Sequence, residues 1–232
     1  MADLFDPTVM LAFLGGRTSE RKLRLFAVAS CRRAPDAFQG KSRRRVRAAL
    51  AAAEAHADWL IGREELSVSA VDMVRLATFG RADLAAADAL LANPSGAHRP
   101  AIPRLPRPAC HFASAALAAC QPDRPERAAA LLRSAEAWGC LYLVEVQAQC
   151  ALLRDLFVNP FLPANLDPRF RTETAVGLAH GIYDDRAFER LPILAGALQE
   201  AGCEDAVVLS HCREPGTHVR GCWVLDWLLG NE

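Results

Sequence analysis

Residues 42–61 read SRRRVRAALAAAEAHADWLI, and this stretch sets the expected fold class. Apolar side chains recur along it three or four residues apart, a spacing that places them on one face of a helix. They are Val46, Ala49, Leu50, Ala53, Ala57 and Leu60. Alanine fills much of the remainder, and alanine has the highest helix propensity of the common residues. The stretch therefore predicts an α-helix with one buried stripe.

The rest of the chain continues this pattern and lacks the alternation of apolar and polar residues that is typical of strands. Hydrophobic residues make up 52% of the 232 positions and aromatic residues only 7%, and much of the apolar content is alanine. We therefore predict an all-α, single-domain multi-helix bundle. A Pro-rich connector at residues 93–108 divides it into a basic helical half, residues 1–92, and a second helical half, residues 109–232.

The N-terminus lacks a basic segment followed by an apolar run, and no stretch approaches eighteen uninterrupted apolar residues. We therefore expect a cytoplasmic protein without a membrane partner. The chain has eight cysteines. In that compartment we expect them to be thiols or metal ligands and not disulfides.

Cysteines and histidines concentrate between residues 203 and 222. We expect a helix over residues 217–229, on which His218 and Cys222 share one face because they are four residues apart. The candidate ligands of a structural zinc ion are Cys203, Cys212, His218 and Cys222, with His211 as the alternative to Cys212. The short CxxC pairs of most zinc motifs are missing. The alternative is that these cysteines are small buried hydrophobic residues.

The same segment predicts no catalytic residue. His218, Cys222 and Asp226 follow one another at four-residue steps, but a catalytic triad needs the imidazole between the thiol and the carboxylate. On a helix that rises 1.5 Å per residue, Asp226 would also lie roughly 12 Å from His218. We therefore favour a non-catalytic protein, with an enzyme whose site is not visible in the sequence as an alternative.

Charge is balanced overall but unevenly distributed. The first fifty residues hold eleven Lys or Arg against four Asp or Glu, although the whole chain has 27 of each class. The densest run of basic residues falls on the first turns of the helix expected over residues 42–61, where the positive end of the helix dipole disfavours cations. Arg43, Arg44 and Arg47 are therefore candidate contacts to an anion or nucleic acid. No aromatic residue is interleaved with them, so we favour a solvated face or an intramolecular ion-pair network over nucleic-acid binding.

Two motifs, LLRDLFVNPF at residues 152–161 and HCREPGTHVRGCW at residues 211–223, resemble an uncharacterised bacterial family. The stretch RKLRLFAVASCRR at residues 21–33 carries the same resemblance. It implies one fold from end to end and supplies no activity, ligand or catalytic residue. We expect a non-catalytic helical module that binds a protein partner or regulates one. The alternative is a zinc-stabilised module that contacts nucleic acid through the basic helix.

Overall fold

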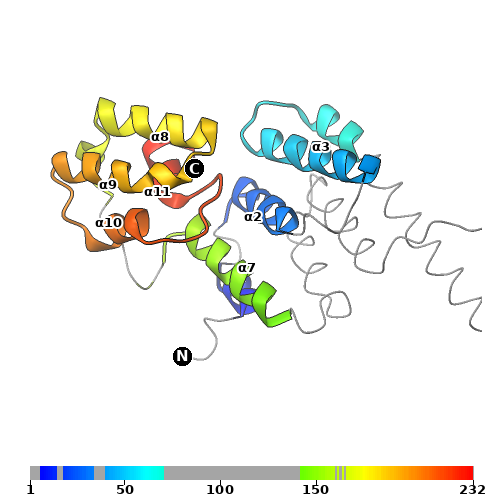
Figure 1. Cartoon of the computed structure of the whole chain (residues 1–232), viewed down its shortest axis with the longest axis horizontal. Coiled ribbons are helices and arrows are strands. Elements are labelled where there is room, and N and C mark those ends of the chain that lie inside the picture. The colour runs from blue at the N-terminus through cyan, green and yellow to red at the C-terminus, as the bar shows by residue number, and fades with distance from the viewer. Residues whose placement is uncertain are drawn as a thin grey trace, which may run out of the picture. The chain divides into compact units, whose positions relative to one another are not determined.

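The described part of the chain folds into helices joined by turns (Figure 1). The computed structural model describes residues 6–14, 18–33, 40–70, 142–159, 161, 164 and 166–231. The α-helices with both ends in these ranges are α1 (Pro7–Leu14), α2 (Glu20–Arg32), α3 (Gly40–Ala57), α7 (Tyr142–Leu156), α8 (Glu173–Asp185), α9 (Leu191–Glu200), α10 (Ala206–Arg213) and α11 (Trp223–Leu229), and residues 63–70 are also helical. Two short 3-10 turns, Pro168–Phe170 and Phe188–Arg190, precede α8 and α9. Among the described residues there is no strand, which confirms the predicted all-α class.

The chain divides into two compact units. One unit comprises residues 1–19 and 147–232, and the other comprises residues 20–146. The N-terminal segment that contains α1 thus belongs with the C-terminal helices. The proposed connector at residues 93–108 lies outside the described residues.

Helix α3 confirms most of the buried stripe read from residues 42–61. Five of its six apolar positions are buried, whereas Leu60 is 71% exposed. The difference arises because α3 ends at Ala57 and Trp59 adopts a left-handed conformation with φ of +57°. The backbone N–H of Leu60 then donates to the carbonyl of Ala55 at 2.8 Å, a bond typical of a helix C-terminus. The chain has therefore left the helix before the sixth apolar position.

Helix α2 packs against α3, and basic side chains of α2 and of Arg33 just after it pair with acidic residues of the same unit. Arg21 reaches Asp58 at 2.9 Å, and Arg33 reaches Glu145 at 3.1 Å. Arg32 binds both carboxylate oxygens of Glu54, at 2.6 and 2.9 Å. The positive excess of the first fifty residues is thus partly neutralised within the fold by pairs in which Glu54 and Glu145 are buried and Asp58 is half-buried.

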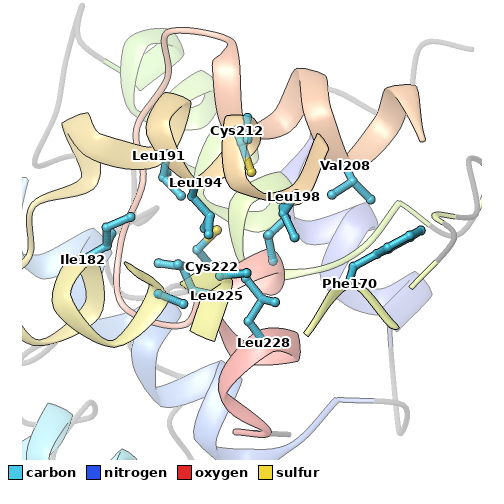
Figure 2. Packing of buried hydrophobic residues seen from close by; sticks show 14 of the residues in the cluster. Phe170, Ile182, Leu191, Leu194, Leu198, Val208, Cys212, Cys222, Leu225 and Leu228 are labelled. Carbon is cyan, nitrogen blue, oxygen red and sulfur yellow. The ribbon is translucent and has the colours of Figure 1, made fainter. Parts of the chain in front are cut away.

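In the other unit, α8, α9, α10 and α11 pack around one hydrophobic core (Figure 2). Local sequence fixes where two of these helices begin. The Thr172 hydroxyl accepts a hydrogen bond from the N–H of Ala175 at the start of α8. The Asp205 carboxylate accepts hydrogen bonds from the first N–H groups of α10. Such caps satisfy donors that have no partner inside the helix.

The last helix is shorter than predicted. A helix was expected over residues 217–229, but α11 begins at Trp223 and Cys222 is its N-cap residue. Two observations explain the late start. Gly221 adopts φ of +92°, and the N–H of Cys222 closes a turn onto the carbonyl of Val219 at 3.0 Å. His218 therefore lies in the loop after α10 and does not share a helical face with Cys222.

Candidate metal centre

Four side chains from separate elements converge in the unit that comprises residues 1–19 and 147–232, called the C-terminal unit below. Asp155 comes from the last turn of α7, His211 from the last turn of α10, His218 from the following loop and Cys222 from the N-cap of α11. One ligand atom of each lies within 4.8 Å of the ligand atom of every other. This group could hold a metal ion. It is called the DHHC site below, after the one-letter codes of its four residues.

Asp155 is the hub of the DHHC site, and its side chain is only 3% exposed. Its Oδ1 lies 2.7 Å from Nδ1 of His218 and 3.4 Å from Nε2 of His211. Its Oδ2 accepts the backbone N–H of Val219 at 2.9 Å. Burial by itself raises the pKa of Asp155, but the hydrogen bonds and charges of the two histidines outweigh burial, so the pKa lies below its usual value. Asp155 is therefore an ionised carboxylate that ties α7 to the loop after α10.

His211 joins Asp155 to Cys222. Its Nε2 lies 3.2 Å from Sγ of Cys222, and its ring is in edge contact with that of His218, with centroids 5.1 Å apart. On the far side of the ring, Nε1–H of Trp223 donates to Nδ1 of His211 at 3.3 Å. An indole nitrogen can only donate, so this bond places the proton of a neutral His211 on Nε2.

Cys222 is fully buried, and burial raises the pKa of its thiol well above the usual value. The negative charge of Asp155 acts in the same direction, while the backbone N–H groups of Leu225 and Val224 oppose it. Without a cation the thiol is protonated. A bound metal ion reverses this balance, because a coordinating thiol loses its proton.

Two of the donor separations in the DHHC site suit a tetrahedral centre, and a third is too short for one. Bonds of about 2.0–2.3 Å to a common centre separate neighbouring donors by roughly 3.3–3.7 Å. The separation between His211 and Asp155, 3.4 Å, falls in this range, and that between His211 and Cys222, 3.2 Å, is slightly shorter. His218 and Asp155, at 2.7 Å, are at hydrogen-bond distance and must move apart by about 0.6 Å to bind one ion.

The structure gathers three of the histidines and cysteines named from the sequence and leaves out two. His218 and Cys222 belong to the DHHC site together with His211, which was the alternative ligand. Cys203 and Cys212 are not members of the group and lie in the hydrophobic core. Burial raises the pKa of Cys212 to about 12. Figure 2 shows Cys212 among the leucines of α9, on the core side of α10.

Sequence reasoning missed Asp155, which lies 56 positions before His211. One signal was present. Asp155 follows Leu152 by three residues in an apolar helix, so both lie on the same face, and Leu152 is fully buried. An acidic residue on an apolar face needs a partner, because a buried charge is unfavourable unless it is paired. The sequence does not say what that partner is.

The DHHC site does not match the order of a catalytic triad. Asp155 and Cys222 both face Nε2 of His211, whereas Trp223 occupies Nδ1, where a triad carboxylate would orient the ring. The Cys222 thiol is also buried and has a raised pKa, whereas a nucleophilic cysteine needs an accessible thiol with a lowered pKa. The geometry therefore gives no support for a Cys–His nucleophile.

The basic run lies on α3. Arg44 and Arg47 are exposed, and Arg43 is half-buried. Within the part of the chain that the structure describes, the ion pairs of the basic N-terminal segment involve α2 and Arg33 and not these three arginines. Their role as contacts to an anion stays a prediction.

Comparison of the chain with family models, with curated proteins and with solved structures gave no match. None of the described helices is both long and apolar enough to cross a membrane.

Proposed function

We propose that the DHHC site binds one structural zinc ion and that the protein is a non-catalytic helical module stabilised by it. The convergence of the four ligand atoms supports this proposal. Two imidazoles and a thiolate favour zinc and similar transition metals over magnesium or calcium, which prefer oxygen ligands. Four protein ligands leave no open position for a substrate, as in structural zinc sites.

The side chains of the site exclude most solvent. His211 and His218 are 16% and 11% exposed, and Asp155 is 3% exposed. An ion at this position would join the end of α7 to α10, the loop after it and the start of α11. Because such a site does not exist in the unfolded chain, the binding energy of zinc adds to the folding energy of this unit.

A metal-free network is the competing state, and the two states exclude each other. Without metal, Nε2–H of His211 points to Asp155 and Cys222, and Nδ1 accepts from Trp223. With metal on Nε2, the ring proton moves to Nδ1, where it faces the indole N–H. Loss of the hydrogen bond from the Trp223 indole to Nδ1 of His211 costs about 1–3 kcal/mol. Structural zinc ions bind with about 10–16 kcal/mol in small peptides, so zinc should prevail where it is available.

The module would work by contact with another protein. Trp59 and Leu60 are 68% and 71% exposed at the end of α3, and a tryptophan is a frequent anchor of protein interfaces. The left-handed backbone at Trp59 is a position that favours glycine, so a tryptophan at this position carries a cost in stability. These observations support a protein partner and do not identify it.

Metal analysis of protein purified without added metal tests the zinc proposal. We expect close to one zinc per chain, and loss of that zinc in Cys222→Ala. Cys212→Ala is the matched control, since it removes a second buried thiol from the same core but not from the DHHC site. Cobalt-substituted protein should show a sulfur-to-cobalt charge-transfer band in the parent and in the control, and no such band in Cys222→Ala. Metal-free parent protein that takes up neither zinc nor cobalt would overturn the proposal.

A further inference from the structure

The C-terminal unit also contains an apolar pocket of about 280 Å³ that plays no part in the DHHC site. Helix α1 forms one wall, with Val9 and Phe13. The end of α7 and the residues after it form the other, with Leu153, Phe157 and Phe161. The rings of Phe13 and Phe161 lie 5.2 Å apart and meet at 37°. Two segments far apart in the sequence thus line one half-open pocket.

Helix α1 leaves most of its apolar side chains at least partly exposed to solvent. Its sequence PTVMLAFL contains no charged residue, yet Pro7 is its only buried residue. Val9 and Phe13 are 43% and 47% exposed, and Phe161 opposite them is 60% exposed. A helix that is apolar on all sides is normally buried. The apolar residues left open here gather around the pocket, which is typical of a binding site.

We propose that this pocket binds a small, mostly apolar ring compound of about two fused rings. A dry apolar cavity of about 150 Å³ holds benzene, and pockets for drug-sized ligands begin near 300 Å³. The pocket lies between these sizes. Its polar lining comes from Arg154 and Asn159, so the ligand carries one polar substituent beside an apolar body. This proposal is independent of zinc in the DHHC site.

Calorimetric titration of the full chain with 2-naphthol, two fused rings with one hydroxyl group, tests the site. We expect saturable binding with one molecule per chain. Val9→Trp places a large ring in the pocket from a half-exposed position and should weaken binding at least about tenfold. Ile193→Trp is the matched control, because Ile193 is an exposed aliphatic residue of α9 outside the pocket lining, and its affinity should equal that of the parent.

Circular dichroism shows whether Val9→Trp is folded. If it is not, Phe161→Ala replaces it, because this change removes part of an exposed wall and should also weaken binding. No saturable binding of 2-naphthol to the parent would overturn the proposal. So would an affinity that is the same in the pocket variants as in the parent, since that result would indicate adsorption to apolar surface outside the pocket.

Discussion

Replacing Asp155 by alanine tests the DHHC site most directly, because this carboxylate is the hub of the group. The change removes the acceptor of two short hydrogen bonds, from Nδ1 of His218 at 2.7 Å and from the N–H of Val219 at 2.9 Å. Leaving a buried donor unsatisfied costs about 1–3 kcal/mol. Breaking a buried charged pair typically costs about 3–5 kcal/mol in total. We therefore expect Asp155→Ala to lower the free energy of unfolding of the metal-free protein by about 3–5 kcal/mol.

Zinc adds a second, separable effect. A ligand that binds only the folded state at a hundred times its Kd stabilises that state by about 2.7 kcal/mol. The parent should gain this increment when free zinc is buffered at that level, and Asp155→Ala should not. The gap between them should thus widen from about 3–5 to about 6–8 kcal/mol. Urea unfolding at 25 °C, followed by circular dichroism with and without zinc, measures both quantities.

Asp226→Ala is the matched control for Asp155→Ala. Asp226 is 1% exposed on α11, and it is a buried carboxylate outside the DHHC site. Its loss should also destabilise the protein but should leave the zinc increment intact. If Asp155→Ala does not fold, Asp155→Asn takes its place, since the amide oxygen can still accept the N–H of Val219. An equal zinc increment in the parent and in the Asp155 variant would refute the assignment of this residue as a ligand, and a cost below about 1 kcal/mol would refute its role as a hub.

Three further outcomes follow from the structure. Trp223→Phe removes the indole N–H that competes for Nδ1 of His211, so we expect zinc to bind about tenfold more tightly; unchanged affinity in a competition titration would contradict the proposed exchange of hydrogen bonds. Trp59→Gly should raise the free energy of unfolding by about 0.5–1 kcal/mol, because relief of the strain in the left-handed backbone outweighs the loss of the ring contact with Arg21. A lower free energy of unfolding in urea experiments would show that the ring packs in the core. We expect the parent not to bind generic duplex DNA at low salt; salt-sensitive binding that Arg44→Gln and Arg47→Gln weaken would establish α3 as an anion-binding surface.

The sequence alone was sufficient for the class of fold and for much of the helical structure. Helix propensity and apolar spacing act within a few residues, so residues 42–61 indicated α3 and five of its six buried positions. The same local reasoning failed where the backbone left the helix. Leu60 continues the apolar spacing, but the left-handed turn at Trp59 places it in solvent. A glycine at position 59 would have marked this end in the sequence.

The candidate site was only partly readable in the sequence. His211, His218 and Cys222 lie within twelve residues, so the sequence alone could place them near one another. Neighbours on a helix point about 100° apart, and only the packed core decides which of them faces it. The side chain of Cys212 lies in the hydrophobic core, and that of the neighbouring His211 belongs to the DHHC site. Asp155 joins the group through tertiary packing of α7, with contacts to His211 and His218 across 56 and 63 positions that no local pattern encodes.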